Sequence, residues 1–381
     1  MALYAVPPKS QPLERRLTEL DRLRSYLARQ LGESAQPWTG ALRRLAAAEA
    51  AVASTSIEGY GASVEDAVEI LAGGHPAQTP ADTQRIIAAY GQAMDRVATL
   101  ADDRHFEWTR QTLLELHFLV CHPQPEAKPG RLRDGAVYVT RGPGRDPFRP
   151  PDAADLPHML DELAGWLQAG DVSRHPVIRA AMGHLNLVSI HPFRDGNGRL
   201  ARIVQSLVLA REGILRPEFV SIEPYLGSHT REYYAVLERT QGPAYDPDRD
   251  GGPWIEFCID AHLSQATERR RWVLTAYARH DFCVRIAAAA GYPERFVIAL
   301  DQALLGLPLT NAEYRREASV ASPTAVQDLQ RLRRDGRLEQ QGAGRSVRYV
   351  ATSGLRQEWS SSWESSQVKA AVDIEEESVK A

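Results

Sequence analysis

The segment from His191 to Arg202 combines residue types that can carry out phosphate chemistry. The run His191-Pro192-Phe193-Arg194-Asp195-Gly196-Asn197-Gly198-Arg199 leads into the apolar stretch 200–210, which we expect to be helical. Glycines at the start of a helix let backbone N–H groups converge on an anion, and the helix dipole adds a partial positive charge. We therefore expect the turn at Gly196 and Gly198 to cradle phosphate groups.

Charged and titratable side chains in the same segment fit this chemistry. Arg199 and Arg202 are three residues apart, so they project from the same side of the first helical turn. The dipole disfavours a cation at a helix N-terminus by ~0.3–1 kcal/mol, which a bound polyphosphate would offset. Asp195 can hold Mg²⁺, since this ion uses one or two carboxylates together with phosphate oxygens. His191 has a pKa suited to proton abstraction at neutral pH.

Together these groups predict phosphoryl or nucleotidyl transfer, in which positioning and charge neutralisation supply most of the catalysis. His191 would deprotonate an attacking hydroxyl, and the arginines would hold the phosphates beyond the scissile bond. Each residue also has a structural reading, because a His before Pro commonly packs or caps and Asp-Gly-Asn-Gly commonly forms a turn. We interpret Phe193 as an apolar anchor of the loop.

The elements that must position this segment are mostly helical. The chain has 381 residues, which favours two or three domains, and 43% hydrophobic and 25% charged residues are typical of globular proteins. Apolar residues recur at three- and four-residue spacing, or strong helix formers dominate, in several stretches. We expect helices over residues 11–31, 38–55, 80–100, 153–167, 177–187, 200–210, 231–241 and 254–279.

Residues 129–151 interrupt the helical pattern. Val137, Tyr138, Val139 and Thr140 have strand propensity, and a Gly- and Pro-rich turn follows them. This predicts a short β-hairpin whose edge can pair with an extended peptide. The alternative is a surface loop.

The pattern changes again in residues 304–355. Two short helices are expected at 310–318 and 322–335, followed by two strands on either side of a Gly-rich turn at 342–345. This is the order of a winged helix-turn-helix module. Residues 310–350 hold eight arginines and five acidic residues, a net +3, whereas the whole chain is −4. The module could bind DNA or another protein.

Several classes of protein are disfavoured by composition. No apolar run approaches the ~20 residues of a membrane span, and the first residues have no apolar core of a secretory signal. Cys121, Cys258 and Cys283 include no CxxC pair, which favours buried thiols in a reducing cytoplasm. We therefore expect a cytoplasmic protein that is not bound to a membrane.

The run beginning at His191 resembles the signature of the Fic (filamentation induced by cAMP) family, HxFx(D/E)GNGRxxR, and matches it through Arg202. Residues 180–190 also resemble the helix that leads into this signature. The resemblance implies an all-α core that binds Mg²⁺ and ATP and transfers AMP to a Ser, Thr or Tyr hydroxyl of a protein target, which could be the chain itself. It also implies that the 129–151 hairpin is a flap that aligns the target.

The resemblance assigns a role to each position of the signature. His191 is the general base, Asp195 the metal ligand, and Arg199 and Arg202 the phosphate-binding arginines, while the anion cradle falls on Gly196, Asn197 and Gly198. Family members that phosphorylate their targets replace the second glycine of this loop with lysine. The glycine at position 198 therefore favours nucleotidyl transfer.

Two further stretches resemble parts of the same family. Ser54, Glu58 and Gly59 fit the (S/T)xxxE(G/N) inhibitory motif, in the arrangement of the subclass whose inhibitory helix precedes the core. Tyr234 and Gln241 lie in a stretch similar to the one that covers the adenine, where Asn is commoner than Gln. This departure leaves the choice of nucleotide open, and core packing of the tyrosines is the alternative.

The resulting prediction is a mainly α protein with a Fic-type helical core, a small β-hairpin flap and a C-terminal winged helix-turn-helix. The expected parts are an N-terminal helical region (1–105), the core (106–265), a helical linker (266–303), the winged helix (304–355) and a disordered tail (356–381). The expected activity is protein adenylyl transfer restrained by Glu58. Alternatives are a DNA-binding regulator, acting through 304–355, and removal of AMP from modified proteins. A homodimer is also compatible with the sequence.

Overall fold

The computed structural model describes residues 3–32, 36–140, 146–213, 215–342, 347–366 and 369. Three predicted features extend beyond these residues: the tip of the hairpin (141–145), most of the turn at 342–345 including Arg345, and the end of the tail with its three glutamates. The described elements are α1 (Gln11–Leu31), α2 (Thr39–Ser56), α3 (Val64–Leu71), α4 (Ala81–Asp102), α5 (Arg110–Cys121), η1 (Pro125–Ala127), η2 (Ala153–Asp155), α6 (Leu156–Ala169), α7 (Pro176–Ile190), α8 (Asn197–Ala210), α9 (Pro217–Val220), α10 (Glu223–Ser228), α11 (Thr230–Gln241), α12 (Gly252–Ala289), α13 (Phe296–Leu304), α14 (Asn311–Ala318), α15 (Ser322–Arg334), β1 (Leu338–Gln341), β2 (Arg348–Ala351) and α16 (Ser353–Glu364).

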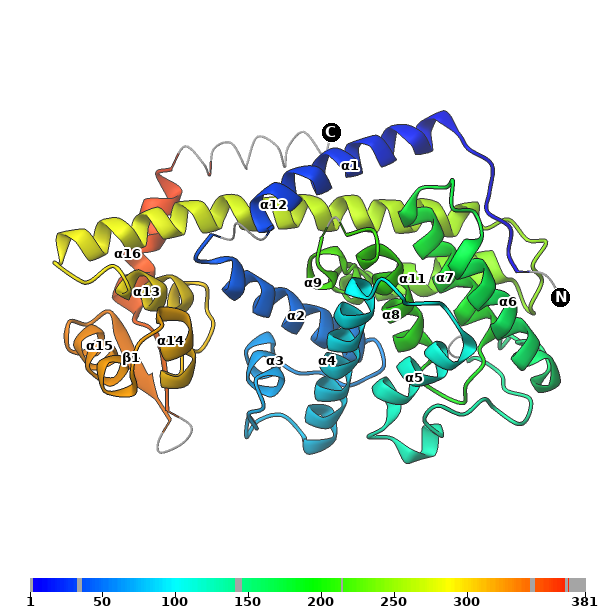
Figure 1. Ribbon diagram of the computed structural model, residues 1–381, viewed down its shortest axis with the longest axis horizontal. Helices are drawn as coiled ribbons and strands as arrows, with labels where there is room; N and C mark the ends of the chain where they lie inside the picture. The colour runs from blue at the N-terminus through cyan, green and yellow to red at the C-terminus, as the bar shows by residue number, and fades with distance from the viewer. Residues whose placement is uncertain are drawn as a thin grey trace. The chain divides into compact units, whose positions relative to one another are not determined.

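The mainly helical fold predicted from the sequence is confirmed (Figure 1). The chain forms two compact units, one of Met1–Ala28 with Ala46–Thr267 and the other of Arg29–Leu45 with Glu268–Ala381. The boundaries fall within α1, α2 and α12, so each of these helices contributes to both units. Among the described residues, no helix has both the length and the apolar character needed to cross a bilayer.

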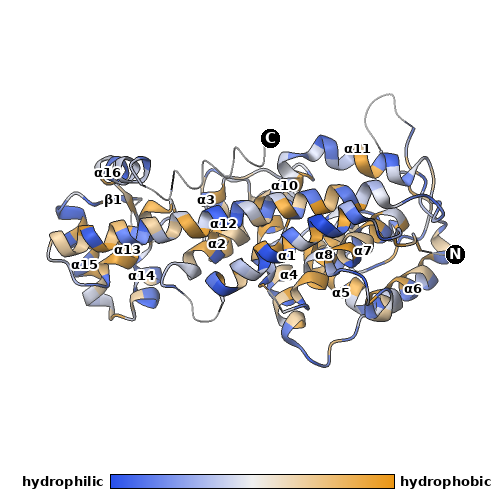
Figure 2. Ribbon diagram, turned by 90° about the horizontal axis from the view of Figure 1, so that it is seen from above, coloured by the Kyte–Doolittle hydropathy of each residue, from blue (hydrophilic) through white to orange (hydrophobic). Residues whose placement is uncertain are grey.

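Helix α8 lies at the centre of the first unit and packs against α4, α5, α7 and α9. All but one of the residues of this helix are buried, the two arginines included. A helix that is buried on every side must be surrounded by other elements. Figure 2 shows the apolar colouring of α7 and α8, which contrasts with the hydrophilic α16. The start of α8 is therefore held in a packed framework.

The predicted hairpin at 129–151 is represented by one antiparallel bridge. Val139 and Phe148 exchange both backbone hydrogen bonds, each 2.9 Å long. Arg149 then forms a parallel bridge with Ala244, which ties this segment to the loop after α11. Phe148 is almost fully buried, whereas Tyr138 is 63% exposed. This flap segment thus has one anchored residue and one large aromatic side chain in solvent.

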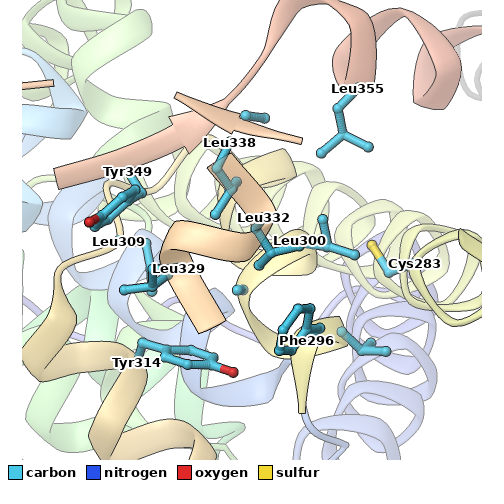
Figure 3. Packing of buried hydrophobic residues seen from close by; sticks show 14 of the residues in the cluster. Cys283, Phe296, Leu300, Leu309, Tyr314, Leu329, Leu332, Leu338, Tyr349 and Leu355 are labelled. Carbon is cyan, nitrogen blue, oxygen red and sulfur yellow. The ribbon is translucent and has the colours of Figure 1, made fainter. Parts of the chain in front are cut away.

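The second unit has its own hydrophobic core (Figure 3). Phe296 and Leu300 of α13 meet Leu329 and Leu332 of α15, and Tyr349 of β2 closes the cluster. Strands β1 and β2 pair antiparallel, from Leu338 opposite Ala351 to Gln341 opposite Arg348. The stretch expected to be a linker, 266–303, therefore supplies part of this core through α13 and the end of α12.

The expected disordered tail begins inside a helix. Helix α16 covers Ser353–Glu364, with the Thr352 hydroxyl accepting the Leu355 N–H as an N-cap. Leu355 is buried in the second core, and the Trp359 ring lies 5.6 Å from that of Phe282. Two apolar side chains four residues apart thus fix a helix in a segment whose average composition favours disorder.

Candidate functional site

His191 directly follows the last residue of α7. Its backbone adopts the left-handed conformation (φ 49°, ψ 58°), and its N–H donates to the Leu187 carbonyl over 3.0 Å. The ring nitrogen Nδ1 lies 3.4 Å from the Val188 carbonyl. A carbonyl can only accept, so this contact favours the tautomer with the proton on Nδ1 and the lone pair on Nε2. Burial lowers the pKa of His191 to about 4, so the ring is a neutral proton acceptor at pH 7.

The loop between His191 and α8 is closed by the Asn197 side chain. The Phe193 N–H donates to Asn197 Oδ1 over 3.0 Å, and Asn197 Nδ2 donates back to the Phe193 carbonyl over 2.9 Å. Phe193 is fully buried, as expected for an anchor. Gly196 caps α8 with φ 78°, and its N–H donates to the Asp195 carboxylate over 2.6 Å. The amide of Asn197 thus holds the loop shape.

His117 of α5 contacts this loop and was not identified from the sequence. Its Nδ1 accepts the Gly130 N–H, so Nε2 carries the proton and donates to the Asp195 carbonyl, both over 2.9 Å. Its ring stacks on Phe193 with centroids 3.6 Å apart and planes 7° from parallel. Burial lowers the pKa of His117 to about 4. No local pattern marks His117, because these partners are 13 and 78 residues away.

Arg133 connects the flap segment to the loop and was also missed. Its guanidinium donates to the carbonyls of His191 (2.8 Å), Gly135 (2.9 Å) and Pro151 (2.5 Å). Its backbone N–H donates to the Pro192 carbonyl over 3.0 Å. One buried side chain therefore fixes both ends of the flap segment against the residue expected to act as the base.

The two arginines of the signature are almost completely buried. Arg199 donates from one terminal nitrogen to the Val120 carbonyl over 3.2 Å, and its other terminal nitrogen lies 3.9 Å from Asp195. The Nε of Arg199 and one terminal nitrogen, Nη1, of Arg202 have no hydrogen-bond partner among the described residues. A buried donor without an acceptor costs about 1–3 kcal/mol, more when it is charged. Both side chains are therefore suited to binding an anion.

The structure brings the predicted inhibitory residues onto Arg202. Its Nε donates to Ser54 Oγ over 2.8 Å, and its Nη2 donates to the Ser54 carbonyl and to Glu58 Oε1, each over 2.9 Å. A Cβ on Gly198 would lie 2.8 Å from the same Glu58 oxygen. Gly59 follows with φ 92°, a conformation that glycine adopts readily. The Glu58 carboxylate thus covers the first turn of α8, at the place where the sequence predicts a phosphate cradle.

The residues expected to contact the base have different environments. Gln241 is buried and donates to Ser189 Oγ over 3.0 Å. Tyr233 is buried, with its hydroxyl 3.1 Å from Nε2 of His184, whereas Tyr234 is 48% exposed. Tyr233 therefore packs in the core, whereas about half of Tyr234 is accessible to solvent.

Comparisons with known proteins agree with this geometry. The model of the Fic/DOC family matches residues 107–209. Protein adenylyltransferase fic-1 from Caenorhabditis elegans is 34% identical over 141 residues, which are 36% of this chain and 25% of the relative. Protein adenylyltransferase Fic from Culex quinquefasciatus is 33% identical over 164 residues, or 43% and 29% of the two chains. The chain thus spans less than a third of the length of these curated relatives.

Solved structures show the same fold. A Fic family protein from Desulfovibrio desulfuricans has a TM-score of 0.58 and 21% identity, covering 91% of this chain and 98% of that chain. A structure of C. elegans Fic-1 has a TM-score of 0.53 and 24% identity, covering 67% and 71%. The signature loop, the helices that carry it and these matches lead to one conclusion: residues 107–209 match the Fic/DOC family model, and the chain is similar in fold to solved Fic proteins.

Proposed function

We propose that this chain transfers AMP from ATP to a Ser, Thr or Tyr hydroxyl of a protein, and that Glu58 restrains the reaction. The observation that carries the proposal is a pair of buried arginines, Arg199 and Arg202, with unpaired N–H groups at the start of α8. His191, which is neutral at pH 7, precedes the same loop. The relatives named protein adenylyltransferase support the reaction class.

In the proposed reaction His191 accepts the proton of the target hydroxyl. The hydroxyl oxygen forms a bond to the α-phosphorus of ATP, the bond from that phosphorus to the bridging oxygen breaks, and pyrophosphate leaves. The N–H groups at the start of α8 would stabilise the α-phosphate in the transition state. Arg199 and Arg202 would bind the departing phosphates. Tyr234 and Gln241 are proposed to contact the adenine.

Asp195 fits the role of a Mg²⁺ ligand. Its side chain is about half exposed and lies beside Gly196, where the phosphates would bind. The described residues contain no cluster of three or more His, Cys, Asp or Glu side chains suited to a metal. An ion held at Asp195 would therefore take its remaining ligands from ATP and water, as Mg²⁺ commonly does. When bound, it would neutralise charge on the phosphates.

Restraint by Glu58 follows from where its carboxylate lies. It pairs with Arg202 and covers Gly198, so it competes with the terminal phosphate for both. ATP could still bind with its terminal phosphate displaced and its α-phosphate turned from in-line attack. Replacing Glu58 should therefore raise the rate of transfer more than it changes the affinity for ATP.

Mass spectrometry of the purified protein and a matching lysate, each incubated with ATP and Mg²⁺, tests this function. We expect AMP adducts on hydroxyl side chains, more with Glu58→Gly than with the parent. Glu65→Gly, which removes an exposed carboxylate from α3, is the matched control and should leave the rate unchanged. His191→Ala should lower transfer by ~10²–10⁴, with ATP affinity within a few-fold.

Two outcomes would contradict the proposal. A folded His191→Ala protein with full activity would exclude His191 as the base. Unchanged transfer by Glu58→Gly, with its melting temperature intact, would exclude the restraint. Incubating an AMP-modified target with the chain separates the alternative, AMP removal, because release of AMP without ATP would identify that reaction.

A second function, DNA binding, is proposed for residues 304–355 as a winged helix-turn-helix. The order of α14, α15, β1 and β2 fits this module, and an isolated antiparallel bridge joins Leu309, just before α14, to Tyr349 of β2. Gln327, Gln330 and Arg334 are exposed on one face of α15, suited to base edges and phosphates. The acidic Asp328 is instead buried.

Fluorescence anisotropy of the full chain with a short DNA duplex tests this second function. We expect binding that weakens with salt, because arginines that neutralise phosphates release counterions. Arg315→Glu with Arg334→Glu should weaken it further, whereas Arg231→Glu, on the exposed face of α11, should not. If no salt-dependent binding to the duplex is detected, the result would instead favour a protein-docking module. A homodimer and a cytoplasmic location also remain proposals, and three buried free cysteines fit a reducing compartment.

A further inference from the structure

Arg202 lies in the same tightly packed pocket as a second carboxylate that the proposed reaction does not use. This pocket, which has no room for a water molecule, is lined by Arg202 and Glu223, both no more than 2% exposed. The other lining residues are apolar or uncharged at pH 7, including His262, whose pKa burial holds well below its usual value. Glu223 is therefore the acidic group that lines this pocket together with Arg202.

Hydrogen bonds fix Glu223 and link it to the inhibitory motif. Tyr90 on α4 donates its hydroxyl to Glu223 Oε1 over 2.7 Å, and the Ser221 hydroxyl donates to Oε2. Burial and Glu223 raise the pKa of the Tyr90 phenol, and the nearby Ser54 side chain lowers it. Tyr90, Ser54 and Ser221 are all essentially inaccessible to solvent. A buried chain of polar groups thus runs from Glu223 through Tyr90 to Ser54, which bonds directly to Arg202.

The donors of Arg202 divide into two sets. The Nε N–H donates to the hydroxyl of Ser54, and one N–H of Nη2 donates to the Ser54 carbonyl. The second N–H of Nη2 donates to Glu58. Nη1 has no hydrogen-bond partner among the described residues and lies 3.2 Å from the place that a Cβ on Gly198 would occupy. An anion at the start of α8 could therefore replace Glu58 while both bonds to Ser54 persist.

We infer that Tyr90 and Glu223 are positioning residues that hold Ser54 and Arg202 ready for an anionic ligand, with Glu223 as the lasting counter-charge of Arg202 and Glu58 as the exchangeable one. The inference rests on the proposed function. A buried cation that loses its sole counter-charge is strongly destabilised. Glu223 accepts hydrogen bonds at both oxygens, as an ionised carboxylate does, and lowers that penalty when Glu58 leaves. Ser54 then serves the active state as well as the inhibited one.

The test compares ATP kinetics in the Glu58→Gly background, where the exchangeable carboxylate is absent. We expect Tyr90→Phe and Glu223→Gln each to raise KM for ATP by about tenfold, because a misplaced arginine weakens a charge-assisted hydrogen bond to phosphate. The value of kcat should stay within about twofold, since His191 contacts neither residue. Tyr314→Phe is the matched control, because Tyr314 makes the same kind of buried bond, to Asp328, in the other unit. It should change neither constant.

An unchanged KM in folded Tyr90→Phe and Glu223→Gln proteins would overturn the inference, as would a fall in kcat alone. Should either variant fail to fold, Ser221→Ala removes one donor to Glu223 from the opposite side and should also raise KM. Calorimetric titration of the same variants with ATP gives a readout that does not require catalysis. If Glu58→Gly transfers no AMP yet these variants bind ATP more weakly, the proposed reaction fails and the positioning role stands.

Discussion

Gly196 has a backbone conformation and surroundings that both exclude a side chain. Its φ of 78° lies in the left-handed region, and a Cβ would lie 2.2 Å from Cys121 Sγ and 3.3 Å from His117 Nε2. The close contact lets α5 pack directly beneath the first turn of α8. At the scale of single residues, position 196 needs a glycine because a side chain would collide with Cys121, as well as because of the phosphate proposed to bind there.

We predict that Gly196→Ala destabilises the protein and that Cys121→Ala restores part of the loss. The left-handed backbone alone should cost a non-glycine residue about 1–2 kcal/mol, and the contact with sulfur adds to this. Removing the sulfur relieves the contact but not the backbone strain. Urea unfolding of the parent, both single variants and the double variant measures the interaction. Additive effects of the two changes would show that the cysteine does not constrain the glycine.

Arg133 acts at the scale of elements, because it joins the flap segment to the end of α7. Three of its donors reach carbonyls on different segments, at His191, Gly135 and Pro151. A lysine has one compact ammonium group and cannot reproduce this planar set of bonds. The position of the flap segment relative to His191 therefore depends on the guanidinium.

We predict that Arg133→Lys lowers transfer to a protein target by about tenfold or more, since it leaves at least one buried carbonyl without its charged donor. ATP affinity should be unchanged, because Arg133 bonds to none of the proposed phosphate-binding residues. Measuring both quantities in the Glu58→Gly background separates them. Arg131→Lys, at an exposed position two residues earlier, is the control. Equal loss of ATP affinity would show that the loop itself had collapsed.

Elements with strong patterns were predictable from the sequence, and long-range partners were not. The predicted helix 11–31 coincides with α1, and the signature located the turn between α7 and α8. His117, Cys121 and Arg133 gave no signal of their contacts with the loop, because each lies 58 to 78 residues along the chain from its partner there. Composition also misjudged the start of the tail, since it averages over Leu355 and Trp359, which anchor α16.

At the scale of the whole molecule, the described part of the first unit holds four neutral histidines, of which His117, His184 and His262 are buried and His191 is partly buried. Burial lowers the pKa of His117 and His191 to about 4 and that of His184 to about 3, and it holds that of His262 well below 6.5. Each would titrate near 6.5 in the unfolded chain. Below that pH the unfolded state binds protons that the folded state does not. Stability is therefore full above about pH 6.5 and falls as the pH drops towards 4.

We predict that the free energy of unfolding of this unit falls steeply between pH 6.5 and 5. Each histidine contributes up to about 1.4 kcal/mol per pH unit, so four approach about 5 kcal/mol per pH unit. Urea unfolding at pH 7.5, 6.5, 5.5 and 5.0 measures the slope.

His117→Gln should reduce the slope of the unfolding free energy by about one proton, because the amide keeps a donor for the Asp195 carbonyl but does not titrate. His105→Gln, at an exposed position, should leave the slope unchanged. Carboxylates titrate equally in all three proteins, so the differences between slopes isolate the histidines. A parent whose stability is flat from pH 6.5 to 5 would show that these rings accept protons in the folded state, and His191 would then lose activity over the same range.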